Sequence, residues 1–222
     1  MYVLYHYCLS PQSRKLRIQL REKGIEAELR AERYWERRRD FLALSPAGEV
    51  PVLLDGQDLV LCDSQTIAEY LEELQPKPTL IGDNIRQRAE TRRLVAWFDQ
   101  KFEREVTTYL LREKVLKRLS GEGGPDSEVL RVAAYNLEYH LRYVAYLAER
   151  RNYLAGEAFS LADIAAAAQL SCIDYLGDVP WERHAEAKVW YARVKSRPSF
   201  RAILADHIAG MPPPKHYANL DF

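Results

Sequence analysis

Short apolar runs rich in strand-forming residues alternate with amphipathic stretches in the first third of the chain. Apolar residues at helical spacing predict helices over residues 13–24 and 63–74. Asp55 and Gly56 form a turn pair between two apolar runs and therefore predict a hairpin. The expected order is strand, helix, strand, helix or loop, hairpin and helix, which indicates a small α/β domain over residues 1–75. The predicted strands are YVLYHY (2–7), EAELRAE (26–32), VPVLLDG (50–56) and LVLC (59–62).

Strand patterns stop after residues 76–84, a segment with two prolines and a glycine that we interpret as a linker between domains. Residues 85–119 carry one long amphipathic pattern, and residues 160–177 are apolar nearly all round, which is typical of a buried central helix. We therefore expect an all-helical domain over residues 85–210. A C-terminal tail, residues 211–222, follows it and is predicted to be extended by its three prolines. The other predicted helices cover residues 127–151, 184–197 and 200–208.

The charge balance excludes some classes of protein. The chain has 222 residues with 32 basic and 32 acidic side chains, and a charge near zero argues against a nucleic-acid binder. No apolar run approaches the roughly 18 residues of a membrane helix, so no membrane insertion is expected. The first residues lack a signal-peptide pattern. The three cysteines and the scattered histidines lack metal-ligand spacing, so we expect a cytoplasmic protein with reduced cysteines and no metal.

A mixed-sheet domain followed by an all-helical one resembles the glutathione transferase superfamily. Three local matches carry the resemblance: SPQSRKLRI resembles its active-site loop and first helix, GEVPVLLDG with LCDSQTIAEYL resembles its glutathione-cradling hairpin, and AGEAFSLADIAAA resembles the capping-box motif of its helical domain. In that motif Ser160 and Asp163 are spaced as a capping box, which we interpret as structural. The resemblance implies an α/β thioredoxin-like N-terminal domain plus an all-α C-terminal helical bundle, assembled as a homodimer. Because a fold hosts many functions, it does not by itself establish an activity.

Ser10 decides whether the chain is interpreted as an enzyme. The resemblance aligns Ser10 with the catalytic serine or cysteine of several transferase classes, and Ser13 with the second cysteine of a thioredoxin-like pair. Two serines cannot form a disulfide, so thiol–disulfide exchange is excluded at this position. In the enzymatic interpretation, the Ser10 hydroxyl hydrogen-bonds to the thiolate of bound glutathione. In the alternative interpretation it caps the following helix. A third hypothesis makes Cys8 a redox sensor.

The resemblance also implies a candidate glutathione site at two further positions. Pro51, after Val50, occupies the superfamily's cis-proline position, where a cis bond turns backbone groups toward a ligand. Asp63 and Ser64 begin a helix, where backbone N–H groups and a hydroxyl can hold the γ-glutamyl carboxylate of glutathione. The structural alternatives are a turn proline and an ordinary helix cap. Glutathione is thus the candidate ligand, and no cofactor is required by the pattern.

Two segments have the composition of partner-binding surfaces. Residues 30–39 place arginines around Tyr34 and Trp35, which is either a solvated face or a binding hot spot. The predicted helix 85–119 carries ten Lys or Arg against five Asp or Glu, a basic excess that would suit an acidic partner. The tail ends in apolar anchors, which either fold back onto the chain's own surface or meet a partner. The candidate partner-binding residues are Trp35, Arg37, Arg38, Tyr217, Asn219, Leu220, Asp221 and Phe222.

The tail together with the segment RYWERRRDF resembles the transferase-like cell-division adaptors of alphaproteobacteria. This resemblance implies a non-enzymatic, homodimeric adaptor in the cytoplasm at the division site. Such an adaptor binds filaments of the tubulin-like protein FtsZ and other division proteins, and it links them to cell-wall synthesis. The alternative function is a glutathione S-transferase or isomerase that uses a serine-activated glutathione thiolate.

Overall fold

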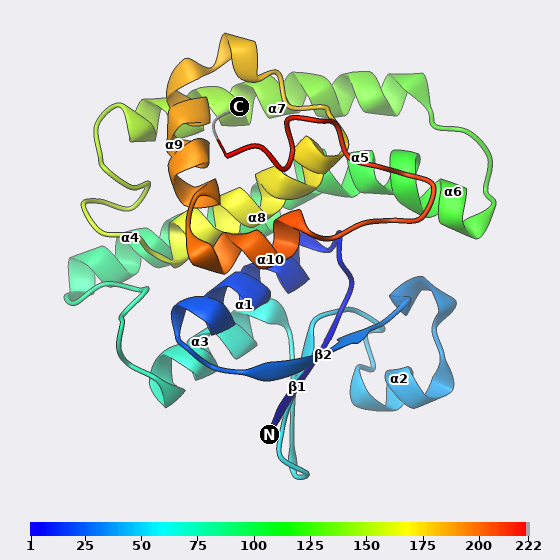
Figure 1. Ribbon diagram of the computed structural model, residues 1–222, viewed down its shortest axis with the longest axis vertical. Helices are drawn as coiled ribbons and strands as arrows, with labels where there is room; N and C mark the ends of the chain where they lie inside the picture. Colours follow the sequence, from blue (N-terminus) through cyan, green and yellow to red (C-terminus); the bar gives the residue numbers. More distant parts are fainter. Residues whose placement is uncertain (221–222) are drawn as a thin grey trace. The chain divides into compact units, whose positions relative to one another are not determined.

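The structure of the chain is a computed structural model that describes residues 1–220 (Figure 1). The chain divides after Leu80 into two compact units, and this boundary falls inside the segment 76–84 that the sequence assigns to a linker. Asp221 and Phe222, two of the candidate partner-binding residues, lie outside the described residues.

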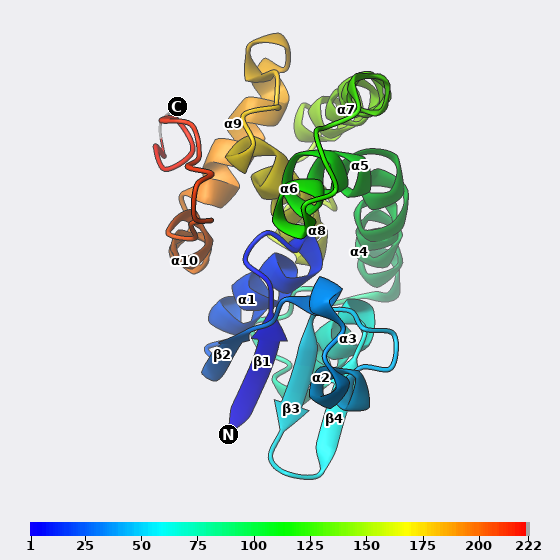
Figure 2. The same cartoon turned by 90° about the vertical axis from the view of Figure 1, so that its right-hand side faces the viewer.

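The first unit is built on a four-stranded mixed sheet in the order β2-β1-β3-β4. Strand β1 is parallel to β2 and antiparallel to β3, which forms an antiparallel hairpin with β4. The helices α1 and α3 lie side by side (Figures 1 and 2). Gln19 of α1 donates a hydrogen bond to the carbonyl of Ala68 in α3 (2.9 Å). The predicted thioredoxin-like domain is thereby confirmed. Its elements are β1 (Tyr2–His6), α1 (Pro11–Glu22), β2 (Ala27–Ala31), α2 (Arg39–Leu44), β3 (Val52–Asp55), β4 (Leu59–Cys62) and α3 (Ser64–Leu74).

The second unit is helical, as predicted. Every residue of α8, from Leu161 to Tyr175, is buried, so α8 is the central helix that the apolar pattern indicates. Ser160 and Asp163 form the predicted capping box at its start. The last predicted helix, residues 200–208, is shorter than expected because the helical turns end at Leu204. The α-helices are α4 (Ile85–Ala96), α5 (Thr108–Leu111), α6 (Lys117–Ser120), α7 (Ser127–Ala148), α8 (Leu161–Tyr175), α9 (Ala185–Lys195) and α10 (Arg201–Leu204).

The helical run from α4 to α6 is continuous but contains two π-helical segments, Trp97–Thr107 and Arg112–Leu116. A buried row recurs at every fourth residue along this run. In a regular α-helix such a row drifts around the axis by about 40° per step, because four residues exceed one turn. The wider π-turns take up the excess and keep the row facing the core. The row consists of Leu94, Phe98, Phe102, Val106 and Leu110, each at most 3% exposed.

The described part of the tail folds back onto the second unit. Tyr217 is fully buried, and its ring packs edge-on against Tyr175 of α8 at 5.2 Å between ring centroids. Figure 1 shows this segment in red, running back over the helices. Among residues 1–220, no helix combines the length and the apolar character needed to cross a membrane.

Candidate functional site

The register of the sheet gathers the residues of the candidate glutathione site at one end of the first unit. Val52, the first residue of β3, pairs with Tyr5 of β1 and with Cys62 of β4. Pro51 precedes Val52 and Asp63 follows Cys62, so both lie at this end of the sheet. The chain also leaves β1 here to reach the start of α1. The predicted residues that lie at or next to this end of the sheet are Ser10, Val50, Pro51, Asp63 and Ser64.

Ser10 caps helix α1. Its Oγ accepts a hydrogen bond from the backbone N–H of Ser13 (3.1 Å), one of the first-turn donors that has no partner inside the helix. The helix therefore begins at Pro11, two residues before the position that the apolar pattern predicts. Within residues 1–220 no group accepts the Ser10 hydroxyl proton. The capping interpretation is confirmed, and the same hydroxyl retains a proton that a ligand can accept.

Ser64 is held by two side chains of α1. Its hydroxyl donates to Oε1 of Gln12 (2.6 Å) and accepts from Nζ of Lys15 (3.0 Å), whose side chain is fully buried. Asp63 caps helix α3 with a carboxylate oxygen that accepts the N–H groups of Gln65 and Thr66 at 2.9 Å each. The structure therefore shows the ordinary-cap interpretation of Asp63. A ligand carboxylate here would share the helix start with a carboxylate that the chain already supplies.

The Val50–Pro51 peptide bond is cis, as the resemblance implies. Val50 belongs to a buried cluster with Phe41 and Val52, against which Tyr5, Tyr7 and Tyr34 pack. This cluster joins α2 to the sheet and fixes the backbone that enters β3. A second cis bond, Lys77–Pro78, lies near the end of the unit and was not predicted.

Neither of the two cysteines in the first unit belongs to a metal or disulfide site. Cys8 and Cys62 are half-buried and take part in no disulfide, and the thiol of Cys62 donates to the carbonyl of Leu44 (3.1 Å). Among the described residues, no group of three or more His, Cys, Asp or Glu side chains has the arrangement of a metal site. The redox hypothesis for Cys8 stays a prediction.

An aromatic cluster with arginines forms a second candidate surface on the first unit, at residues 33–39. Trp35 is half-buried and meets Tyr7 and Tyr34 edge-on, with ring centroids 4.9 and 5.3 Å apart. Exposed Arg37 and Arg39 follow it in the chain, and within residues 1–220 neither has a carboxylate partner. We call Trp35, Arg37 and Arg39, together with the rings of Tyr7 and Tyr34, the Trp35 surface.

Arg38, a predicted partner-binding residue, is engaged inside the first unit. Its guanidinium bonds to Glu32 (2.6 Å), whose side chain is 1% exposed, and to Asp40 (2.8 Å). The hydrogen bonds that Arg38 donates to Glu32 are the main reason why the pKa of Arg38 lies above its ordinary value. Arg38 therefore neutralises a buried carboxylate inside the first unit, and its role in partner binding stays a prediction.

The structure corrects the expectation that Tyr217 is exposed for partner binding. The sequence assigned it to partner binding, but its side chain is fully buried and its hydroxyl donates to the carbonyl of Ile203 (3.2 Å). Of the other predicted tail residues, Asn219 is exposed and Leu220 is half-buried. The interpretation that the tail folds back onto its own surface is thus the one that the structure bears out for Tyr217.

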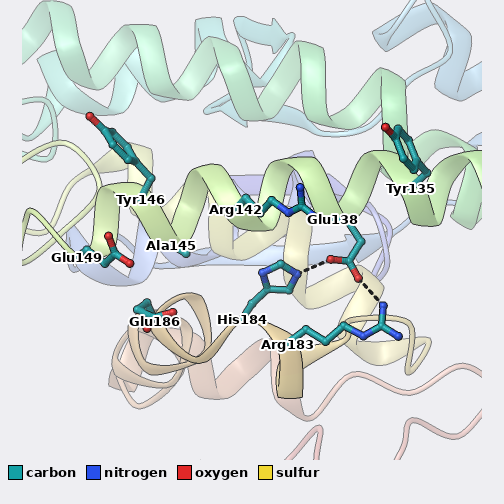
Figure 3. Close-up of a pocket in the computed structure, with 9 residues that line it drawn as sticks. All are labelled: Tyr135, Glu138, Arg142, Ala145, Tyr146, Glu149, Arg183, His184 and Glu186. Atoms are coloured by element: carbon teal, nitrogen blue, oxygen red, sulfur yellow. Dashed lines mark hydrogen bonds and ion pairs between the residues drawn. The ribbon is translucent and has the colours of Figure 1, made fainter.

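The second unit carries a groove of about 620 Å³ between α7 and the start of α9, which sequence reasoning missed (Figure 3). At one end of it, Glu138 accepts from buried His184 (2.7 Å) and from Arg183 (3.0 Å). Burial raises the pKa of Glu138, but these two hydrogen bonds outweigh it and leave the pKa below its ordinary value. The lining comes from two distant segments without a motif, so no sequence signal pointed to it. The lining residues are Tyr135, Glu138, Arg142, Ala145, Tyr146, Glu149, Arg183, His184 and Glu186.

Comparisons with known proteins agree with this architecture. A relative named FtsZ-localized protein A, from Caulobacter vibrioides, is 47% identical over 222 residues, covering 99% of this chain and 97% of the relative. The solved structure of FzlA from C. crescentus matches with a TM-score of 0.97 and 46% identity, over 100% of this chain and 99% of that one. A solved glutathione S-transferase from Rhodospirillum rubrum F11 matches with a TM-score of 0.98 and 54% identity, over 100% of both chains.

Two family models match the chain in succession. The N-terminal domain of glutathione S-transferase matches residues 4–79, and the C-terminal domain of glutathione S-transferase matches residues 109–198. These ranges fall in the sheet-containing unit and in the helical unit, respectively. The chain therefore belongs to the glutathione S-transferase family.

Proposed function

We propose that the chain is a cell-division adaptor that binds FtsZ filaments and links them to cell-wall synthesis, without using the transferase site for catalysis. The observation that carries this proposal is the near full-length similarity, at 47% identity, to a relative named FtsZ-localized protein A. The adaptor is a cytoplasmic homodimer that acts at the division site and also contacts other division proteins.

The Trp35 surface is the part of the first unit best suited to hold a protein partner. Its three rings pack edge-on against one another, so the indole of Trp35 is held in place before a partner arrives. A held aromatic ring loses little conformational freedom on binding, which is why Trp and Tyr dominate binding hot spots.

The charges around Trp35 determine which partner fits. Arg33 pairs with Glu36, and Arg38 pairs with Glu32 and Asp40. Arg37 and Arg39 remain as cations without a carboxylate partner among residues 1–220. The Trp35 surface therefore suits an acidic segment of the filament, and the contact is expected to weaken as salt rises.

Co-sedimentation with FtsZ filaments tests the proposal. For Trp35→Ala and for the double variant Arg37→Ala with Arg39→Ala, we expect most of the adaptor to stay in the supernatant, because each variant removes part of the Trp35 surface. The control is Arg131→Ala on α7, whose side chain is 78% exposed. Melting temperatures of all variants show whether the fold is intact. If folded wild-type protein fails to sediment with filaments, the adaptor function is wrong. If the wild type sediments and the Trp35-surface variants sediment equally well, another surface makes the contact.

A second candidate function, glutathione conjugation, is favoured by one observation. The Ser10 hydroxyl keeps a proton that no described residue accepts, so it is free to stabilise a bound thiolate. Titration calorimetry with millimolar glutathione tests for the ligand, and a conjugation assay tests for turnover. Heat of binding together with turnover that disappears in a folded Ser10 variant would support an enzyme. No heat at millimolar glutathione would exclude this candidate.

A further inference from the structure

A buried carboxylate of the second unit holds the C-terminal tail. Asp174 of α8 is fully buried, and its Oδ1 accepts from the indole N–H of Trp181 (2.8 Å) and lies 3.0 Å from Nε2 of His216 in the tail. Trp181 belongs to the bundle, so its bond persists wherever the tail lies. The bond to His216 exists only when the tail is docked. The tail thus adds one polar contact to a buried carboxylate that Trp181 and Tyr191 of the bundle also contact.

A buried lysine reaches the tail from the neighbouring helix. The Nζ of Lys195 in α9 donates to the backbone carbonyl of His216 (3.1 Å) and lies 3.9 Å from Oδ2 of Asp174. The rings of Tyr191 and Tyr217 flank it, each 5.9 Å from Nζ. Burial lowers the pKa of Lys195 to about 8, although the nearby Asp174 carboxylate opposes this shift. The docked tail therefore covers a buried ammonium group whose pKa lies below its ordinary value.

Tyrosine hydroxyls fasten the tail on either side of this pair. Tyr175 of α8 donates to the carbonyl of Met211 (2.7 Å) and accepts from the N–H of Ile208 (2.8 Å). Tyr217 contributes the buried ring and its bond to Ile203. These contacts are local, so the tail can detach while α8 and α9 keep their own packing. Detachment would transfer His216 and Tyr217 to water and would uncover the side of Lys195 that the tail contacts.

We propose that the C-terminal tail is a latch closed over Asp174 and Lys195, and that proton uptake by the uncovered lysine favours its opening. In the closed state Tyr217 is withheld inside the unit. In the open state Tyr217 becomes an exposed aromatic anchor. The latch goes beyond the adaptor function and does not depend on it, because all its contacts lie within the second unit.

The direction of the pH effect follows from the lysine. In the open state the tail no longer covers Lys195, so its pKa moves back toward the ordinary value of 10.5, whereas in the closed state burial lowers the pKa to about 8. Between these values the open state binds more protons, so the latch tightens as pH rises. The open-to-closed ratio falls by at most tenfold per pH unit, and by at most roughly 300-fold over the whole interval. The ionisable groups around Lys195 in these contacts are Asp174 of α8, Tyr191 of α9, and His216 and Tyr217 of the tail.

Hydrogen exchange of the full-length chain, read by mass spectrometry on a peptide covering 211–220, tests the latch. The reporters are the N–H groups of Tyr217 and Asn219, which are bonded to the carbonyls of Pro214 and His216. Protection factors, corrected for intrinsic exchange, are compared from about pH 7.5 to 10, the range in which Lys195 changes its protonation. We expect wild-type protection to rise steeply above about pH 8. Lys195→Met, which keeps the packing and removes the titration, should lose this rise. The control Lys188→Met, on the same helix, should behave as wild type.

A second pair of variants tests the docking contact itself. His216→Ala removes the donor to Asp174 and should speed exchange of the tail by roughly tenfold at one pH, the loss expected for one hydrogen bond. His216→Gln can still donate and should restore protection. The proposal is overturned if Lys195→Met keeps the wild-type pH dependence, if wild-type protection does not change with pH, or if His216→Ala leaves exchange unchanged.

Discussion

The indole N–H of Trp97 donates a hydrogen bond to Nδ1 of His140, 3.1 Å away. Because an indole N–H can only donate, Nδ1 is the unprotonated nitrogen of the ring, and Nε2 carries the proton. Nε2 lies 3.1 Å from Oε2 of Glu105, which accepts that proton's hydrogen bond. Burial lowers the pKa of His140, and the hydrogen bond to Glu105 opposes this shift only in part. The bundle therefore contains a neutral, fully buried histidine with one fixed tautomer.

Because His140 is buried in its neutral form, we expect the free energy of unfolding to fall in mild acid. As pH falls below the ordinary histidine value of 6.5, the unfolded state takes up a proton that the folded state does not. The free energy of unfolding should then fall by up to about 1.4 kcal/mol per pH unit from this residue. In His140→Gln, the amide still accepts from Trp97 and donates to Glu105 but cannot titrate, so its denaturation midpoints should depend less on pH. His207→Gln, at an exposed position, is the control. Equal pH dependence in wild type and His140→Gln would contradict the prediction.

Ser10 allows capping and catalysis to be separated by two substitutions. Ser10→Ala should lower the free energy of unfolding by about 1 kcal/mol, because the N–H of Ser13 loses its acceptor. Ser10→Asp should retain most of the stability, since a carboxylate also caps, but it has no hydroxyl proton for a thiolate. Urea denaturation measures the first effect and a glutathione conjugation assay the second. If Ser10→Asp conjugates glutathione as well as wild type, Ser10 has no catalytic role.

Removal of the tail should destabilise the second unit. Tyr217→Ala empties a fully buried position, so a loss of about 3 kcal/mol is expected if the tail stays docked. Tyr217→Phe removes only the hydrogen bond to Ile203 and should cost about 1 kcal/mol. Asn219→Ala, at an exposed position, should change stability by less than about 0.5 kcal/mol. Thermal denaturation of the three variants checks the order. A truncation after Pro214 that melts like wild type would show that these contacts contribute nothing.

Arg38 should behave differently from its neighbours Arg37 and Arg39. Arg38→Ala leaves the Glu32 carboxylate buried without its guanidinium, so the melting temperature of the first unit should fall. Arg38→Lys should restore part of the loss, because a lysine keeps the charge but not the paired geometry. Arg39→Ala should leave the melting temperature unchanged. Differential scanning calorimetry distinguishes these variants. A wild-type melting temperature for Arg38→Ala would show that Glu32 finds another partner.

The sequence predicted the elements that are marked by a local apolar periodicity and by turn or capping residues at their ends. The strands around the Asp55–Gly56 turn and the central helix 161–175 follow from apolar patterns, and the cap at Ser160 follows from a spacing of three. The order of domains followed from where strand patterns stop. The short helix α2 was left open as helix or loop because its six residues carry too few apolar positions to set a period.

The candidate site was only partly predictable. Ser10, Pro51 and Ser64 came from motif matches, and the register of the sheet explains why they meet. Partners that come from distant segments were not predictable, because nothing local signals them: Lys15 and Gln12 lie 49 and 52 residues from Ser64 in the chain. For the same reason, the sequence could not show that Tyr217 meets α8 and α10 and is buried.

The π-helical turns between Trp97 and Leu116 have a consequence for how this helix can change over evolution. Its buried row repeats every four residues, so a substitution at one position leaves the other buried side chains facing the core. A one-residue deletion would rotate everything after it by about 100° around the axis. A deletion before Thr107 would break the hydrogen bond from Thr107 to Gln169 and the one from Lys114 to Asp178. Insertions and deletions in homologous chains should therefore fall in the loop after α6, and rarely between residues 94 and 116.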